Sequence, residues 1–378
     1  RRARAARGRK DPPRELPPSA DEAAHGAAVL REVRRQGETC EFTLLDALRQ
    51  LPNLAHEAAG ARFIQARLAA ARPEDRTLAL ERLLPEVLQL ANDAHGHLVV
   101  QKMLDVGTPE QRRSVALQLR REALRLSNKM HGCRVMQKAF QVCAPEVQLM
   151  LAEELKKGVS DCMKSMHGNY VIQMCIEQMP PDSVSFVVEA IEDRAEQTSG
   201  HIYGCRIIQR LLEHCSHARL DTMIGRILNY IPDLAEDAYG NYVIRHLLDH
   251  GRKEDKQRIL EVVRDNAAQL SLDKCASNVV EKCIEASTVG EHAHALQTER
   301  AGLLHALLGE AGDLSAPVFG LIEDRFGKYV VQCIIENSKR EDKVLLRKHL
   351  AAAGPRVRKG GLNCAAHLAA LDRQLRDA

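Results

Sequence analysis

The sequence HGNYVIQMCI at residues 167–176 recurs along the chain at a constant interval. Its relatives are HGHLVVQKML from residue 95, HGCRVMQKAF from 131, YGCRIIQRLL from 203, YGNYVIRHLL from 239 and CASNVVEKCI from 275. Successive second residues are 36 positions apart, as Gly96 and Gly132 are, and one step back from Gly96 reaches Gly60 in AGARFIQARL. A last copy, FGKYVVQCII, places Gly327 51 positions after Ala276, an excess of 15. The chain therefore contains eight units, called repeats 1–8 below.

The residues between these motifs follow a helical pattern. Apolar residues are spaced three and four apart in segments such as 80–90 and 145–155, and no hairpin turn signals occur. A recurring helix start or connector is indicated by Pro73, Pro109, Pro145 and Pro181. A unit of about 36 residues, with two longer helices and a short connector, buries its apolar face only against neighbours. The prediction is an all-α fold: a right-handed, crescent-shaped α-solenoid of eight repeats with caps at both ends.

Composition excludes several classes of protein. The 378 residues carry 54 Lys and Arg against 51 Asp and Glu, so no protein-wide positive field attracts a nucleic acid. Aromatic residues make up 3% and Trp is absent, which disfavours β-sheet platforms that stack bases. No apolar run approaches the roughly 20 residues of a membrane span. The 11 Cys never form a CxxC pattern, which is typical of free thiols in a reducing compartment.

Enzyme motifs are missing. The HExxH pattern fails after His56 because position 60 is Gly, and the Gly327–Lys328 dipeptide lacks the hydroxyl ligand of a P-loop. The chain has no GxGxxG and no GxSxG. Histidines that directly precede the motif glycines are interpreted as helix-entry residues: His95, His131 and His167. The sequence thus predicts no catalytic site, no metal site, no cofactor and no enzymatic activity.

The recurring helix has two faces, as repeat 4 illustrates. At about 100° per residue, one arc of about 140° holds Val171, Ile172, Cys175 and Ile176. A separate arc of about 100° holds Asn169, Tyr170 and Gln173. The first arc is predicted core, and the second presents one trio of polar or planar side chains per repeat.

The trios use a restricted set of residues, namely Asn-Tyr or Cys-Arg followed three residues later by Gln. Amides and carboxylates suit the edges of bases, whereas Tyr and Arg planes stack on them. One edge-reading set and one stacking residue per helical unit is the logic of RNA recognition at one base per repeat. The alternative left open is a protein-binding scaffold of the armadillo or HEAT kind, without RNA affinity.

Over residues 21–378 the chain resembles the Pumilio homology domain of the PUF family, on the motifs GNYVIQ, GCRVMQ, GCRIIQ and ASNVVEKC. The resemblance implies single-stranded RNA on a concave face, with the C-terminal repeat at the 5′ base. It implies that Asn with Gln selects uracil, Cys or Ser with Gln adenine, and Ser with Glu guanine. It further implies a cytoplasmic, monomeric regulator of messenger RNA 3′ untranslated regions, working with deadenylase or translational-repressor proteins on the convex face.

Carried onto this sequence, the resemblance assigns three RNA-binding residues to each repeat. From repeat 1 to repeat 8 they are Ala61, Arg62, Gln65; His97, Leu98, Gln101; Cys133, Arg134, Gln137; Asn169, Tyr170, Gln173; Cys205, Arg206, Gln209; Asn241, Tyr242, Arg245; Ser277, Asn278, Glu281; and Lys328, Tyr329, Gln332.

Four repeats depart from the family pattern. Repeat 1 has Ala61 where Ser is expected, and repeat 8 has Lys328 where Asn is expected. Repeat 2 has His97 and Leu98 in place of Asn and Tyr, and repeat 6 has Arg245 in place of Gln. The implied target is 5′-UG(U/C)AUANA-3′. A ribosome-biogenesis PUF relative with low sequence specificity is the other alternative, and it would have degenerate trios throughout.

The remaining segments carry weaker predictions. Residues 1–20 form a basic, Pro-rich flank that is interpreted as disordered, as a nuclear signal or as an auxiliary RNA-binding arm. Residues 24–47 and 356–378 are predicted caps. The insertion at 287–317, with a helical stretch at 301–308, is either a surface loop or a protein-binding one. Basic residues just after the trios either approach phosphates or solvate the rim: Lys102, Lys138, Arg210 and Lys282.

Overall fold

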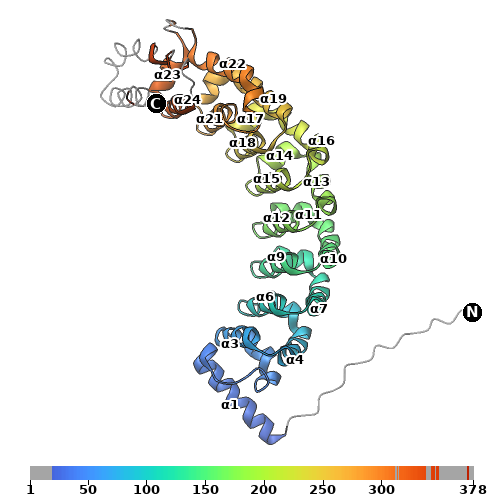
Figure 1. Ribbon diagram of the computed structural model, residues 1–378. Coiled ribbons are helices and arrows are strands. Elements are labelled where there is room, and N and C mark those ends of the chain that lie inside the picture. Colours follow the sequence, from blue (N-terminus) through green and yellow to red (C-terminus); the bar gives the residue numbers. More distant parts are fainter. Residues whose placement is uncertain are drawn as a thin grey trace, which may run out of the picture. The chain divides into compact units, whose positions relative to one another are not determined.

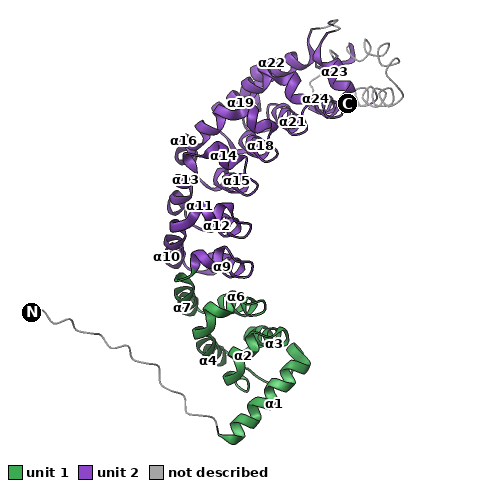
Figure 2. Cartoon of the chain, turned by 180° about the vertical axis from the view of Figure 1, so that it is seen from behind, with its two compact units in different colours: residues 1–122 green, residues 123–378 purple. Residues whose placement is uncertain are grey.

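The computed structural model describes residues 19–310, 313, 315–337, 342–344, 346–348 and 373. Every regular element within them is a helix, which confirms the all-α prediction for the part described. None of these helices combines the length and the apolar character that a bilayer crossing requires. The chain divides into two compact units, residues 1–122 and 123–378 (Figure 2).

The repeats of unit 2 pass through helices in a fixed order, namely a short helix, a motif helix that begins at the second motif residue, and a flanking helix (Figure 1). The short helices are α8 (Ala123–Ser127), α11 (Val159–Lys164), α14 (Ala195–Ser199), α17 (Ile231–Glu236), α20 (Ala267–Ser271) and α23 (Pro317–Glu323). The motif helices are α9 (Gly132–Val142), α12 (Gly168–Gln178), α15 (Gly204–His214), α18 (Gly240–His250), α21 (Ala276–Ala286) and α24 (Gly327–Asn337). The flanking helices are α10 (Pro145–Leu155), α13 (Ser185–Glu192), α16 (His217–Ile227), α19 (Lys253–Asp265) and α22 (Gln297–Leu308).

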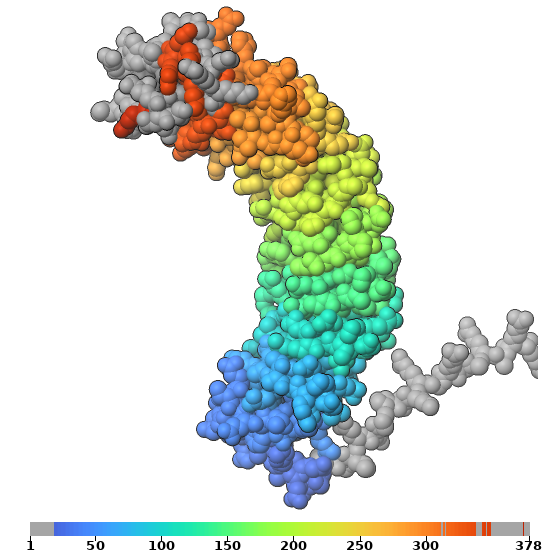
Figure 3. All heavy atoms as spheres, in the orientation of Figure 1, coloured from blue at the N-terminus to red at the C-terminus, as the bar shows by residue number. Residues whose placement is uncertain are grey.

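Consecutive motif helices of unit 2 pack against one another from α9 through α24. Figure 2 shows α9, α12 and α15 along one side of this unit and the flanking helices α10, α13 and α16 along the other. In the space-filling view the repeats of unit 2 follow one another as successive bands of colour (Figure 3). The residues of the predicted apolar arc in α12 are at most 1% exposed. Stacking therefore supplies the core that a single repeat lacks.

The glycine that opens a motif helix is required by a close backbone approach. A Cβ atom added at Gly132 would lie 2.5 Å from the carbonyl oxygen of Leu126, at the end of the preceding short helix. At Gly168 it would lie 2.7 Å from the oxygen of Cys162. Repeat 7 departs from this rule with a fully buried Ala276 at the same position. The glycines thus set how closely each motif helix follows its short helix.

Unit 1 contains repeats 1 and 2 and the segment before them. Its helices are α1 (Ala20–Gln36), α2 (Leu51–Ala55), α3 (Ala58–Ala70), α4 (Pro73–Leu83), α5 (Val87–Leu90), α6 (Gly96–Val106) and α7 (Pro109–Arg120). The motif helices α3 and α6 pack side by side. Helix α1 and the 3₁₀ turn Gly37–Thr39 pack against α3, in the segment for which the cap at 24–47 is predicted.

The insertion between repeats 7 and 8 is split around a flanking helix. The connection from the motif helix to the flanking helix covers positions 143–144 in repeat 3 but 287–296 in repeat 7. The connection onward to the next short helix covers 156–158 in repeat 3 and 309–316 in repeat 7. The stretch expected at 301–308 is the C-terminal part of α22, which packs against α19 and α23. The extra residues therefore lengthen two connections and leave the stacking of flanking helices intact.

The insertion is tied to repeat 8 by a buried cation. Arg300 is 4% exposed, and its guanidinium pairs with Oδ2 of Asp342 at 2.8 Å. The same group donates hydrogen bonds to the hydroxyl of Thr288 and to the carbonyl oxygen of Asn337. The predicted flank at 1–20 and the predicted cap at 356–378 lie outside the described residues, apart from residues 19, 20 and 373.

Candidate nucleic-acid interface

Six motif helices, α6, α12, α15, α18, α21 and α24, are capped by a side chain three residues before their first residue. In repeat 6, Oδ1 of Asp237 accepts hydrogen bonds from the backbone N–H groups of Tyr239 at 2.8 Å and Gly240 at 2.7 Å. Side chains at the equivalent position make the same pair of contacts elsewhere: Asp93, Ser165, His201, Asp273 and Asp324. These contacts satisfy donors that helix starts leave open, and they fix where the trio begins.

In unit 1 the capping residue Asp93 also connects two repeats. Nδ1 of His56, in repeat 1, lies 3.0 Å from Oδ2 of Asp93 in repeat 2. Burial alone would raise the pKa of Asp93, but hydrogen bonds from Gly96, His56 and His95 lower it to about 2. Asp93 is therefore ionised at neutral pH and acts as a charged acceptor at the start of α6.

The first residue of the trio is recessed in repeats 3–7, whereas Lys328 of repeat 8 is half-buried. The five recessed residues are between 1% and 4% exposed: Cys133, Asn169, Cys205, Asn241 and Ser277. The helical wheel placed Asn169 on an open face, whereas its amide donates to the backbone carbonyls of Ser165 at 2.8 Å and Met166 at 3.1 Å. At the start of a helix such a side chain folds back onto the preceding turn. In unit 1 Ala61 is buried and His97 is half-buried.

The second residue of the trio is exposed in every repeat except repeat 7. Tyr170, Tyr242 and Tyr329 are 49%, 42% and 52% exposed. Planar groups of adjacent repeats face each other, since Cζ of Arg134 lies 5.9 Å from the centre of the Tyr170 ring. Cζ of Arg206 lies 5.5 Å from the Tyr242 ring. Arg62 and Leu98 are exposed in unit 1, and Asn278 is half-buried in unit 2. A planar ligand between two such groups would be stacked on both sides.

The third residue of each trio offers hydrogen-bonding groups beside the planes. In repeat 4, Nε2 of Gln173 donates to Oδ1 of Asn169 at 2.9 Å, so the first and third residues of this trio bond to each other. In repeat 3, Nε2 of Gln137 is buried and has no acceptor among the described residues beyond the adjacent Cys133 thiol. An unsatisfied buried donor carries a desolvation cost that a ligand acceptor would relieve. The other third-position glutamines are Gln65, Gln101, Gln209 and Gln332.

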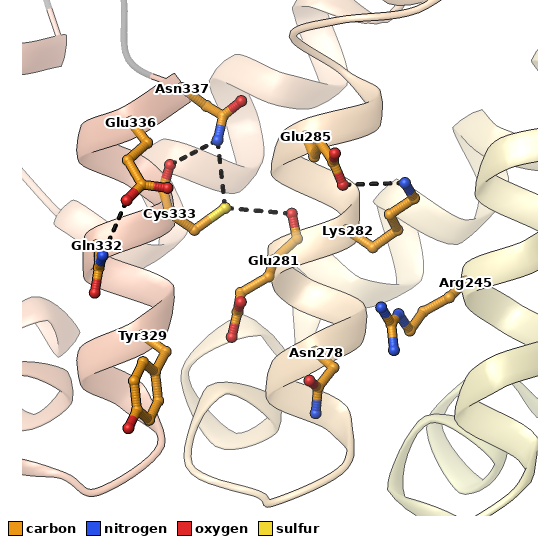
Figure 4. A pocket seen from close by; sticks show the side chains of 10 residues that line it. All are labelled: Arg245, Asn278, Glu281, Lys282, Glu285, Tyr329, Gln332, Cys333, Glu336 and Asn337. Atoms are coloured by element: carbon orange, nitrogen blue, oxygen red, sulfur yellow. Dashed lines mark hydrogen bonds and ion pairs between the residues drawn. The ribbon is translucent and has the colours of Figure 1, made fainter.

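Repeats 6, 7 and 8 line an open cavity of about 460 Å³ (Figure 4). Its lining includes Arg245 from α18, Asn278 and Glu281 from α21, and Tyr329 and Gln332 from α24. Figure 4 shows the guanidinium of Arg245 directed toward α21 and the carboxylate of Glu281 between α21 and α24. The cavity therefore gathers residues of the predicted trios of repeats 6, 7 and 8.

Two charged trio residues influence each other inside this cavity. Burial raises the pKa of Glu281, the Arg245 guanidinium opposes that rise, and the carboxylate of Glu336 adds to it. Nε of Arg245 is buried and has no hydrogen-bond partner among the described residues. The Arg245 guanidinium also lies 5.8 Å from the centre of the Tyr242 ring. Arg245 thus faces both the plane of its own repeat and the acid of the next one.

A ladder of ion pairs follows the trios in unit 2. Nζ of Lys282 lies 2.7 Å from Asp249 and 3.0 Å from Glu285. Two repeats earlier, Arg210 contacts Glu177 at 3.9 Å and also pairs with Glu213. Lys282 and Arg210 are therefore paired with carboxylates in the free protein. This pairing favours the interpretation that they solvate the rim over the one in which they approach phosphates.

Sequence reasoning missed the residues that place and connect the trios. Acidic residues three before the first residue of the motif helix recur with the same 36-residue period, as Asp237 and Asp273 do, so a period search could have found them. His95, His131 and His167 are the N-cap residues of α6, α9 and α12, in agreement with the helix-entry interpretation.

Seven segments match the family model described as the Pumilio-family RNA binding repeat: residues 86–119, 123–156, 159–192, 197–228, 230–264, 266–296 and 318–350. The chain belongs to the Pumilio (PUF) family. The matched segments contain the motif helices of repeats 2–8, and the motif of repeat 1 lies before them. The count of eight repeats stays a prediction, supported by the packing of α3 on α6.

Solved PUF structures share this fold. The Puf3 RNA binding domain bound to a Cox17 RNA 3′ UTR recognition sequence (site B) is 29% identical, with a TM-score of 0.79, over 91% of this chain and 99% of that one. PUF-8 in complex with PBE-RNA is 27% identical, with a TM-score of 0.83, over 92% and 99%. The yeast Puf5p RNA-binding domain bound to SMX2 RNA, at 24% identity, a TM-score of 0.68 and coverage of 87% and 96%, supports the fold alone. Comparison with curated protein sequences gave no match.

Proposed function

We propose that this protein binds single-stranded RNA sequence-specifically, with one base contacted by each repeat. The observation that carries the proposal is the repeated arrangement on packed motif helices, with a recessed first residue, an exposed second residue and a hydrogen-bonding third residue. Such a unit can hold a base between planes while its edge meets the other two side chains. The unsatisfied donors of Gln137 and Arg245 supply a reason for a ligand to bind there.

The sharpest base assignment is guanine at repeat 7. Ionised Glu281 is an acceptor-only group, and guanine alone presents two adjacent donors, N1–H and N2–H, on its Watson–Crick edge. Uracil is assigned to repeat 4 through Asn169 and Gln173, and adenine to repeats 3 and 5 through a Cys and Gln pair. With uracil at repeat 8 and adenine at repeat 1, the proposed element is 5′-UG(U/C)AUANA-3′.

Repeat 6 relaxes the third base. The Arg245 guanidinium has donors and no acceptor, so it cannot receive the N3–H of uracil, whereas cytosine presents acceptors at N3 and O2. Asn241 stays available to uracil, and both pyrimidines are therefore accommodated. The charge interaction between Arg245 and Glu281 does not oppose this assignment, because a guanidinium offers several donors in different directions.

The biological role that we propose is post-transcriptional. Puf3, 29% identical to this chain, was solved with a 3′ UTR recognition sequence, which supports messenger RNA 3′ untranslated regions as the target. The protein would act as a monomeric cytoplasmic regulator of translation or stability. It would bring repressor or deadenylase proteins to the RNA through surfaces away from the trios, and it would have no catalytic activity of its own.

The proposal is tested by fluorescence anisotropy with labelled RNA at one fixed salt concentration, because phosphate contacts make affinity salt-dependent. The RNA 5′-UGUAUAUA-3′ is compared with 5′-UCUAUAUA-3′, with the DNA of the same sequence and with an RNA hairpin. We expect at least about tenfold weaker binding after the guanine change, since a good bidentate pair discriminates by about 1–3 kcal/mol. Equal binding of all RNAs would indicate a relative of low specificity, and no binding would indicate a protein-binding scaffold.

A further inference from the structure

A cluster of two histidines and a glutamate lies at the end of two motif helices, outside the trios. His246 and His250 are four residues apart on α18, so they share one face of that helix. Glu213 lies in the last turn of α15, which packs against α18. The cluster therefore joins repeats 5 and 6 within unit 2.

The geometry of the cluster is close. Nε2 of His246 lies 2.9 Å from Oε1 of Glu213, and the two imidazole rings have centroids 4.4 Å apart with planes tilted by 34°. Each residue offers a ligand atom within 4.8 Å of the others. Nε2 of His246 is closed off from water and lies beside the carboxylate of Glu213. The nitrogen and the carboxylate, which come from two stacked motif helices, are therefore already brought together.

Among the ion pairs that follow the trios, the residue at position 246 is unusual. The position of His246 is occupied by Arg210 in repeat 5 and by Lys282 in repeat 7, each paired with carboxylates. In repeat 6 the cation is replaced by an imidazole, and a second imidazole stands one turn further along the helix. Among the residues that the structure describes, this is the one group of three His, Cys, Asp or Glu side chains placed to hold a metal ion.

We propose that Glu213, His246 and His250 bind a divalent transition metal ion of the Zn²⁺ class. Two imidazoles and one carboxylate form a ligand set that suits Zn²⁺, with bonds of about 2.0–2.2 Å and a fourth position for water. The ligand atoms need only a small side-chain rotation to reach one ion from their present separation. The other oxygen of Glu213 faces Arg210, which holds the carboxylate with Oε1 toward His246.

A bound ion would cross-link repeat 5 to repeat 6. Glu213 comes from α15 and both histidines come from α18, so coordination bridges two stacked motif helices. A ligand that binds only the folded chain stabilises it by mass action. Metal should therefore raise the melting temperature of the protein, and this rise should depend on all three ligands. The site is independent of the proposed RNA binding and stands or falls by itself.

The test uses the full chain, freed of metal with a chelator and titrated with Zn²⁺ by isothermal calorimetry. The variants are His250→Ala, at an exposed side chain whose loss leaves the core intact, and Glu213→Gln, which keeps the shape of the side chain. The matched control is His214→Ala, because His214 is a neighbouring histidine whose Nε2 lies 4.0 Å from Oε2 of Glu213. We expect one equivalent bound by the unmodified chain and the control, and at least about tenfold weaker binding in both ligand variants.

Co²⁺ provides a second readout that identifies the donor atoms. Coordination by nitrogen and oxygen gives weak visible absorption without a thiolate charge-transfer band, whereas binding to cysteine gives that band. Unchanged affinity in His250→Ala would overturn the proposal. A thiolate band, or an equal loss of binding in His214→Ala, would also overturn it.

Discussion

Repeats 4 and 6 begin alike and differ at their third residue. Both have a buried Asn followed by an exposed Tyr, and both motif helices are capped three residues before they start. In repeat 4, Gln173 bonds to Asn169 within its own trio. In repeat 6, Arg245 has a buried Nε without a partner in the described structure, and its charge acts on Glu281 of repeat 7. The third residue of repeat 4 thus interacts within its own trio, whereas Arg245 of repeat 6 interacts with the charge of the next repeat.

The largest expected effect comes from giving repeat 7 the residues of repeat 4. The double substitution Ser277→Asn with Glu281→Gln replaces an acceptor-only edge by an Asn and Gln pair. We expect the preferred second base to change from guanine to uracil, with a reversal of about tenfold or more in each direction. Competition binding with paired RNAs measures it. A double mutant that still prefers guanine would refute the assignment of repeat 7.

The next effect comes from giving repeat 6 the third residue of repeat 4. The unmodified protein should bind RNAs with uracil or cytosine at the third base to within about 1 kcal/mol, or about fivefold. Arg245→Gln should restore a clear preference for uracil. Dissociation constants for both RNAs and both proteins at one salt concentration decide it. If the unmodified protein rejects cytosine as strongly as the variant does, Arg245 does not read the base.

The comparison extends to repeat 2, which lacks a plane. Leu98 is 40% exposed but cannot stack as Tyr170 does, so substitution of the seventh base should cost less than substitution of the second or fourth. Leu98→Tyr with His97→Asn should strengthen binding to an RNA with uracil at that base by about 1 kcal/mol or more. Equal penalties at all three bases in the unmodified protein would contradict this expectation, and anisotropy with singly substituted RNAs measures them.

A smaller effect tests the coupling itself. Glu281 accepts two hydrogen bonds from guanine only when ionised, and burial raises its pKa, so guanine preference should decline as pH falls from neutral toward acid. Arg245 opposes that rise in pKa; hence Arg245→Gln should move the decline to higher pH. Affinities for guanine and adenine at the second base across pH measure it. The fifth base, which we assign to repeat 4, serves as control, and an unshifted profile in the variant would show that the two repeats are not coupled.

The smallest effect on RNA binding should come from the caps. Asp237→Ala removes a carboxylate that accepts at 2.8 and 2.7 Å, whereas Ser165→Ala removes a hydroxyl that accepts at 3.3 and 3.1 Å. We expect both to lower the free energy of unfolding by about 0.5–2 kcal/mol, with Asp237→Ala the more costly, and to leave base preference unchanged. Denaturant unfolding compares them. A larger loss in Ser165→Ala would contradict the ranking that we draw from these contacts.

Much of the fold could be predicted because the repeat period fixes it. The 36-residue step located the motif helices and the proline-started flanking helices, since both depend on residues close together in sequence. The role of the insertion at 287–317 could not be predicted from the sequence. Its helix α22 packs against α19 as a flanking helix while the connections on either side of it lengthen, and only this packing shows it.

The candidate site was less predictable because its contacts join different repeats. A helical wheel cannot show that Asn169 folds back onto the carbonyl of Ser165, nor that Arg245 faces Glu281. Lys282 and His246 each meet a carboxylate that belongs to the preceding repeat. Which basic residue is neutralised, and which histidine meets a carboxylate, depends on stacking that periodicity alone does not specify.

The most direct test of base reading by individual repeats is selection of bound RNAs from a random pool, followed by sequencing. The protein should enrich guanine at the second base and the sequence AUA at the fourth to sixth bases. It should enrich both pyrimidines at the third base, which we assign to Arg245, and show little preference at the seventh, which we assign to Leu98. A pool without enrichment, or a motif in which the third and seventh bases are as sharply defined as the second, would contradict the account.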